Sequence, residues 1–407
     1  MRAFVAVLIG LALPVVATAP PADAQTRDSA GMQIVESSIA RAGTRAPFRV
    51  SDRPTLQIGV ESGDPAQQFT EIAAATRLAD GSIVVADRRT SEIRIFDASG
   101  RFLRKLGRRG QGPGEFNEIA DIRVIGRDTL VAWDAFGRFT IFSPTGSVAR
   151  TFSVRSDPDS GRPLGLVRGA LGDGSFFAYR VARIPAPQTE AAVRDTQRVA
   201  LYTRDGAYVR PVGDFLGLER LLDAGGSMPG PDGVMRAAWS VRGKPFARET
   251  YMRAGAEWLY VGRGDRYEIL GFDRTGALRR IIRTDQAPIP VTSEIIAAQR
   301  RQRRGRNSPS RPIVDPKIDA IWYPKVLPAY GALRIDPAQR LWVQDYPIPG
   351  EKQPRWKVFN PDGALLGTVL TPADVEVLEI GTDYLLGWWR DDLDVEYLRM
   401  YALTPAT

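Results

Sequence analysis

The sequence predicts an all-β fold built from a repeated unit of four short strands, and three observations support this prediction. Residues 69–146 contain two copies of one sequence unit. The sequence of residues 69–73 recurs with one change at residues 116–120, which lie 47 positions later. Short apolar runs separated by turn residues continue along the rest of the chain. In five of the units a glycine follows the third apolar run and predicts a turn: Gly100, Gly146, Gly206, Gly276 and Gly363. A repeat of about 40–50 residues made of short strands is typical of the blades of a β-propeller.

The predicted units number six and form one large domain, residues 51–405. The first two units correspond closely, since residues 83–87 align with 130–134 and a third strand follows each. Asp80 and Gly81 provide a hairpin turn between the first two strands of the first unit. The recognisable strands of the six units begin near residues 72, 119, 167, 258, 333 and 375. The sequence therefore predicts a six-bladed β-propeller.

The sequence also predicts how the propeller closes. The last unit, residues 375–401, ends one strand short of four. Residues 55–59 alternate apolar and polar side chains, which indicates a spare strand ahead of the first unit. We therefore expect residues 56–58 to pair with the strand near residues 397–401, so that an N-terminal strand joins the last blade.

Three insertions are expected in the later units. Residues 184–198 are rich in proline and charge, and glycine and proline pairs within residues 214–250 predict a long loop. Residues 293–304 predict a short helical insertion. Thr292 or Ser293 could cap this helix, and a glycine follows its last turn.

The first 24 residues have the features of a cleaved signal peptide. A basic residue precedes an apolar stretch over residues 3–17, and residues 22–24 form a small-x-small cleavage pattern. The alternative is a membrane anchor, but the run is short and interrupted by Pro14, and a spanning helix needs about 20 apolar residues. We expect a periplasmic or extracellular protein with no integral membrane segment after cleavage. Residues 25–50 are polar, and we expect an irregular leader or linker there.

The chain contains no cysteine and no histidine, which narrows the available chemistry. Without cysteine there is neither a lipid anchor at the cleavage point nor a disulfide, and this fits a bacterial exported protein. Without histidine, His-containing triads, imidazole bases and His metal sites are excluded, so any metal would need oxygen ligands. The net charge of +8 could favour anionic partners, although a genome that encodes arginine freely explains it more simply.

Residues 107–116 form a glycine-rich linker between the first two units and resemble the linker of NHL-type repeats. The runs at residues 83–87 and 93–97, followed by Gly100, continue that pattern. Over residues 56–152 the chain resembles exported bacterial six-bladed β-propeller proteins, and elsewhere it shares only the strand and turn pattern. The resemblance implies a scaffold that serves binding proteins and, in related six-bladed folds, lactonases and lyases, so it does not select a function.

Glu71 and Glu118 are the candidate ligand-binding residues. They occupy the same repeat position, where the linker enters the innermost strand of adjacent blades at one rim of the channel. Two such carboxylates could act as acid/base groups or as Ca²⁺ ligands, and the alternative is a solvated or Arg-paired linker glutamate. We expect the two side chains to lie close together, which requires a cation or an arginine nearby. The sequence assigns no catalytic residue and no metal ligand.

Three further groups each have a structural and a functional explanation. Asp87 and Asp134, with Asp345 in a similar position, either form a ring of carboxylates for a cation or end strands by accepting bonds from the next turn. Four tryptophans in strand-like runs either pack between blades or stack on sugars: Trp133, Trp342, Trp388 and Trp389. Five arginines form either an anion patch for a polyanion or a solvated loop: Arg300, Arg301, Arg303, Arg304 and Arg306.

Two functions remain open at this point. The first is an exported, monomeric, non-enzymatic propeller that binds an unidentified ligand or protein at one rim and needs no cofactor. The second is a metal-dependent hydrolase or lactonase of the six-bladed class, for which Ca²⁺ is the expected cofactor. Convergent oxygen ligands in the channel mouth would favour the enzyme, and an apolar or Arg-lined mouth would favour binding. We favour the first function.

Overall fold

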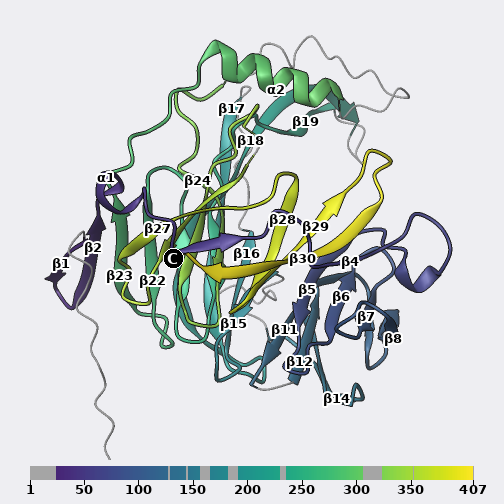
Figure 1. Cartoon of the computed structure of the whole chain (residues 1–407). Helices are drawn as coiled ribbons and strands as arrows, with labels where there is room; N and C mark the ends of the chain where they lie inside the picture. The colour runs from purple at the N-terminus through teal and green to yellow at the C-terminus, as the bar shows by residue number, and fades with distance from the viewer. Residues whose placement is uncertain are drawn as a thin grey trace, which may run out of the picture.

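A computed structural model describes residues 24–126, 129–143, 145–155, 166–181, 191–229, 235–305, 323–351 and 353–406. The predicted signal peptide, residues 1–24, lies outside them except for Ala24. Within the described residues most of the chain is β-strand, arranged as six blades (Figure 1). The innermost strands of successive blades contact one another in a closed ring. In ring order these strands are β5 (Ile72–Arg77), β11 (Ile119–Ile125), β15 (Leu166–Ala170), β20 (Tyr251–Ala254), β24 (Tyr330–Ile335) and β28 (Val375–Ile380). The predicted six-bladed β-propeller is confirmed.

The first two blades have four strands each, as predicted. Blade one adds β6 (Ile83–Asp87), β7 (Glu92–Phe96) and β8 (Phe102–Leu106), and blade two adds β12 (Thr129–Asp134), β13 (Arg138–Phe142) and β14 (Val148–Ser153). Two short strands, β9 (Arg108–Arg109) and β10 (Glu115–Phe116), pair in the linker between them. Every residue of β6 is buried, because neighbouring blades cover both of its faces. This burial explains why the strand is a continuous apolar run until its final aspartate.

Gly100 shows why a glycine recurs after the third strand of each repeat. Its φ of 85° lies in the left-handed region that favours glycine. An added Cβ would lie only 3.1 Å from Leu56 Cδ1, on β4 (Leu56–Ile58) of the preceding blade. The equivalent Gly146 approaches Leu106 of blade one in the same way. These two repeat turns therefore pack against the outer strand of the blade before them.

Blade three contains an extended hairpin that the sequence did not predict. Blade three consists of β15, β16 (Phe176–Val181), β17 (Ala191–Tyr202), β18 (Tyr208–Pro229) and β19 (Met235–Gly243). The extended hairpin is formed by the last three of these strands. The long loop expected over residues 214–250 is wrong for residues 214–229 and 235–243, which are strand, and the expected insertion at 184–198 is strand from Ala191 onward. Residues 184–190 and 230–234 lie outside the described residues. Pairing with both neighbours satisfies the backbone of β18 whatever its side chains are. A register shift between Ala224 and Ser227 accommodates the glycine pair there.

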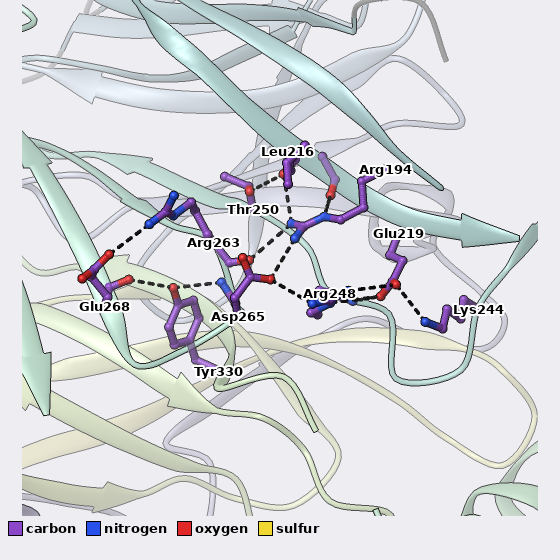
Figure 2. Close-up of polar contacts among 12 residues, drawn as sticks. Arg194, Leu216, Glu219, Lys244, Arg248, Thr250, Arg263, Asp265, Glu268 and Tyr330 are labelled. Carbon is purple, nitrogen blue, oxygen red and sulfur yellow. Dashed lines mark hydrogen bonds and ion pairs between the residues drawn. The ribbon is translucent and has the colours of Figure 1, made fainter. Parts of the chain in front are cut away.

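Charged side chains fasten this hairpin to blade four (Figure 2). Arg194 Nη1 lies 2.9 Å from Asp265 Oδ1, and Arg248 Nη1 lies 3.5 Å from the same oxygen. Glu219 accepts hydrogen bonds from Lys244 Nζ at 2.8 Å and from Arg248 Nη2 at 3.1 Å. Burial opposes the ionisation of Glu219, but the bonds from Arg248 and Lys244 outweigh it and lower its pKa to about 2.

Blade four is completed by residues expected to be irregular. It contains β20, β21 (Leu259–Gly262), β22 (Glu268–Phe272) and β23 (Leu278–Thr284), and the hairpin of β1 (Ala24–Ser29) and β2 (Met32–Ser37) extends it. The expectation of an irregular leader over residues 25–50 is therefore wrong, since β2 pairs in parallel with β23 and β3 (Phe48–Val50) pairs with blade six. The edge of β23 provides backbone partners, and β2 buries Val35, so a largely polar segment forms a strand.

Blades five and six confirm the predicted closure. Blade five consists of β24, β25 (Leu341–Asp345), β26 (Arg355–Phe359) and β27 (Leu365–Leu370). Blade six contains β28, β29 (Tyr384–Arg390) and β30 (Glu396–Pro405), and β4 pairs antiparallel with β30. Ile58 lies opposite Leu398, as the sequence predicts.

The helices are few and short. α2 (Ser293–Gly305) confirms the helical insertion near 293–304, and Thr292 caps it by accepting a hydrogen bond from Ile295 N at 3.4 Å. The other helical segments are α1 (Ile39–Ala42) and a 3₁₀ turn at Pro65–Gln67. Among the described residues, no helix has both the length and the apolar character needed to cross a membrane.

Candidate functional site in the central channel

Within the described part of the chain, we consider two cavities beside the inner strands, one toward each end of these strands. The upper cavity has a volume of about 570 Å³ and lies where β24 and β28 begin, with Gln299 and Gln302 of α2 in its lining. α2 lies at the top of the molecule in Figure 1. The lower cavity, of about 450 Å³, is lined by residues from the far ends of the six inner strands. Arg334 lines both cavities, so this side chain adjoins each of the two spaces.

Aromatic and amide side chains form part of the wall of the upper cavity, together with charged residues. The aromatic residues are Phe246, Tyr251, Tyr346, Trp356 and Trp388, and the amides besides those of α2 are Gln344 and Gln353. Trp356 is 1% exposed, and its Nε1 has no hydrogen-bond partner within the described part of the chain. A buried donor without an acceptor costs about 1–3 kcal/mol, so an oxygen atom placed there by a ligand or a water would be stabilised.

Two further features of the upper cavity are energetically costly. Phe246 has a φ of 50°, a left-handed conformation that is unfavourable for a bulky side chain and often marks a functional site. Asp345 forms an ion pair with Lys357 beside the wall. Burial raises the pKa of Asp345 and lowers that of Lys357, and in each case the partner's charge opposes the shift. The left-handed backbone of Phe246 and the buried ion pair of Asp345 therefore both lie at the upper cavity.

The lower cavity contains a buried carboxyl group from blade six. Glu379 accepts hydrogen bonds from the hydroxyl of Tyr384 and, at 3.5 Å, from Arg77 N. Burial raises the pKa of Glu379, although bonds from Thr76 and Tyr384 act in the opposite direction. This carboxyl group therefore tends toward its neutral form more than an exposed glutamate does.

The two candidate glutamates at the rim are brought together by an arginine. Arg88 Nη1 lies 3.1 Å from Glu71 Oε1, and Arg88 Nε lies 3.8 Å from Glu118 Oε1. The expectation that the two carboxylates share a nearby arginine is confirmed. Each side chain is more than 40% exposed, and neither lines the upper or the lower cavity. They form a surface ion-pair network at the junction of blades one and two.

The structural explanation holds for the first two candidate aspartates. Asp87 is fully buried and accepts hydrogen bonds from Thr70 N at 2.9 Å and Thr90 N at 3.1 Å. Asp134 accepts one from Phe136 N at 2.9 Å. Asp345 differs, since its partner is a lysine. Among the described residues, no group of three or more acidic side chains is arranged to hold a metal ion.

The basic run begins on α2, whereas the four candidate tryptophans lie on strands of blades two, five and six. Arg300 and Arg301 are exposed on α2, the side chains of Arg303 and Arg304 are outside the described part of the structure, and Arg306 lies outside the described residues. All four tryptophans pack against the clusters between blades, as the structural explanation requires, with Trp133 and Trp342 fully buried and Trp388 and Trp389 partly buried. Trp388 lines the upper cavity, whereas its neighbour Trp389 does not and instead stacks on Arg399.

A protein-family comparison supports the fold, and several solved structures align with most of the chain. Residues 70–141 match a family model described as a 6-bladed beta-propeller, DUF5128. A Bacteroides fragilis protein described as exported aligns with 92% of this chain and all of its own, at 11% identity and a TM-score of 0.48. A DUF4221 family member from Bacteroides vulgatus aligns with 88% of this chain and 99% of its own, at 10% identity and a TM-score of 0.49. Regucalcin, a calcium-binding protein from Agrobacterium tumefaciens, aligns with 89% of this chain and 97% of its own, at 10% identity and a TM-score of 0.41. No curated protein matches the sequence.

Sequence reasoning missed the arginines of the channel. Arg123 occupies the position equivalent to Thr76 by the same 47-residue shift that relates the first two blades, so one of them could have been located. Arg253 and Arg334 lie in blades whose repeats are too divergent to align from sequence. The bulge between Ile72 and Ala74 also changes which side chains face the channel, and a bulge leaves no clear signal in the sequence.

Proposed function

We propose that this protein is an exported, non-enzymatic propeller that binds a small molecule in the upper cavity of its channel. The main support is the cavity itself, which has a volume of about 570 Å³ and a wall that includes aromatic and amide side chains. Small-molecule sites typically occupy about 300–1,000 Å³ and combine apolar walls with a few fixed polar groups. Here the polar groups include the unpartnered Trp356 Nε1 and the guanidinium of Arg334. The other charged residues of the lining are Asp345, Glu351, Arg355, Asp374 and Glu376.

The arginines of the channel support binding over a metal-dependent reaction. Arg334 lines both cavities, and Arg123 and Arg253 also line the lower one. At the rim, Arg88 supplies the positive charge that Glu71 and Glu118 would otherwise need from a metal ion. We retain these two glutamates as a proposed second contact surface for a ligand or a protein.

Export to the periplasm or beyond is part of the same proposal. It rests on the basic start, the apolar run and the cleavage pattern of residues 1–24. Mass spectrometry of the protein recovered outside the cytoplasm should find Gln25 as its first residue. An intact Met1 in that fraction would contradict cleavage.

The binding function can be tested without knowing the ligand. The mature chain is incubated with a small-molecule extract of bacterial cells, washed by ultrafiltration and denatured, and the released molecules are identified by mass spectrometry. The parent should retain a molecule that Trp388→Ala loses, because Trp388 lines the upper cavity. Trp389→Ala is the matched control, since Trp389 lies next in sequence and stacks on Arg399 outside the cavity lining.

Two outcomes would overturn this function. Equal retention by the parent and by Trp388→Ala would show that the upper cavity is not the site. Conversion of the retained molecule during prolonged incubation would show that the protein is an enzyme.

A further inference from the structure

The six inner strands place one residue each at a common level of the channel. These residues pair with equivalent positions on the second strand of each blade: Thr76, Arg123, Gly169, Arg253, Arg334 and Glu379. We call this level the waist. Three of its six positions are arginine, while the small residues from blades one and three leave space beside them. All except Gly169 line the lower cavity.

Two of the three waist arginines share one carboxylate. Arg123 Nη2 lies 2.7 Å from Asp121 Oδ2, and Arg253 Nη1 lies 3.7 Å from the same oxygen. Arg334 donates only to carbonyl oxygens, to Val377 O at 2.9 Å from Nε and to Leu333 O at 2.8 Å from Nη1. Among the described residues, Asp121 is the one carboxylate within ion-pair distance of these arginines.

Positive charge therefore exceeds negative charge at the waist. Glu379 completes the ring, but it is held by Tyr384, and burial raises its pKa. Burial, followed by the charge of Arg123, holds the pKa of Arg253 well below its ordinary value. Burial also lowers the pKa of Arg334, although the charge of Glu376 opposes this shift. Buried cations whose charge is only partly balanced are costly, and an added negative charge would relieve each of these effects.

The arginines are also accessible to a ligand. The side chains of Arg123 and Arg253 keep 20% and 21% of their surface exposed, and both line the lower cavity. Arg334 lines this space and also the upper cavity. Guanidinium groups present paired N–H donors in a planar fork that matches the oxygens of a carboxylate or a phosphate.

We propose that the waist is an oxyanion site, in which Arg123, Arg253 and Arg334 bind a carboxylate or phosphate group. This inference rests on the proposed function to the extent that the group belongs to a molecule whose body occupies the upper cavity. The molecule would then be an organic anion whose charged end reaches Arg334 and whose body packs against Tyr251 and Trp388. Phosphate and carboxylate ligands share this chemistry, and the experiment separates them.

Isothermal titration calorimetry with the full mature chain tests the site. The probes are sodium phosphate and sodium acetate, with sodium chloride at the same ionic strength as the reference. We expect the parent to bind one oxyanion, and Arg253→Gln and Arg334→Gln to raise its dissociation constant at least tenfold. Arg279→Gln is the matched control and should stay within twofold of the parent, because Arg279 is an exposed side chain of blade four paired with Asp273. Tighter phosphate binding identifies a phosphate ligand, and tighter acetate binding identifies a carboxylate.

Thermal unfolding supplies a second readout. In the absence of oxyanions, Arg253→Gln should melt no lower than the parent, because it removes a buried charge that Arg123 repels. A purely structural arginine would lower the melting temperature when replaced. The oxyanion site is overturned if chloride binds as well as the probes do, or if both waist variants bind within twofold of the parent.

Failure of this site can be distinguished from failure of the proposed function. Trp388→Ala leaves the waist arginines in place and should bind the probe as the parent does. Oxyanion binding without any retained small molecule would overturn the proposed function alone. A retained molecule without oxyanion binding would overturn the waist site alone.

Discussion

Ile58 lies directly opposite Leu398, so residues 340 positions apart in the chain form one ladder of the closing blade. Ile58 is 1% exposed and packs with Phe69 and Phe96 of blade one, and so the closing strand belongs to the core between the last blade and the first. The backbones of β4 and β30 also approach each other very closely at Gly59, next to the end of β4.

Gly59 offers a sharp test of this closure. Its φ is +133°, and an added Cβ would lie 2.9 Å from Tyr397 Cδ1 and 3.0 Å from Glu396 O. Gly59→Ala should lower the free energy of unfolding by about 2–4 kcal/mol, from backbone strain plus overpacking. Gly63→Ala is the control, because its φ is +109° but an added Cβ meets no atom within 4 Å. Urea unfolding of both variants measures the difference, and equal losses would show that the approach of β4 to β30 does not limit stability.

The stability of the blade-three hairpin should depend on pH through Glu219. Its pKa in the folded protein is about 2, below the ordinary value of 4.5, so its contribution is complete above about pH 5 and is lost as the pH falls toward 2. Glu219→Gln should cost about 3 kcal/mol at pH 7, because it leaves the buried Lys244 without its partner. The difference in free energy of unfolding between parent and variant should shrink between pH 5 and pH 3. A difference that stays constant over this range would contradict the assignment.

The rim network should contribute little to stability. Arg88→Gln leaves Glu71 and Glu118 without their shared cation, but all three side chains are more than a third exposed. We expect a loss below about 1 kcal/mol that diminishes at high salt, and recovery when Glu118→Gln is added. The exposed neighbour Arg89 provides the control variant Arg89→Gln. A loss of several kcal/mol, insensitive to salt, would show that the network is structural rather than a contact surface.

The basic run at the end of α2 can be tested with heparin. If its arginines bind a polyanion, replacing all five with Ser should lower the salt concentration that elutes the protein, through reduced counterion release. The variant replaces Arg300, Arg301, Arg303, Arg304 and Arg306. A control with the same net charge replaces five exposed arginines elsewhere: Arg101, Arg104, Arg204, Arg274 and Arg279. Equal elution of the two variants would show that only net charge matters.

Features of the fold that depend on local sequence were predictable, and features that depend on distant partners were not. The repeated strands, the turn glycines and the closing strand were predictable because alternating or continuous apolar runs and left-handed turns are local properties. The strands β2 and β18 were not predictable, because both depend on backbone partners supplied by distant parts of the sheet. The repeat placed the two candidate glutamates at equivalent positions, and each lies within ion-pair distance of Arg88. The waist arginines were missed because their proximity arises from six strands converging on one axis.

The path of residues 24–58 has a consequence for how the molecule is made. This segment runs from the edge of blade four, past blade five, where Thr368 N donates to Arg45 O at 2.7 Å, to the closing strand in blade six. This segment is synthesised before the six blades, yet β3 and β4 pair with β30, the last strand of the described residues. These two strands must therefore wait for their partner until almost the whole chain is present, so the final locking of the ring is necessarily a late event in biogenesis.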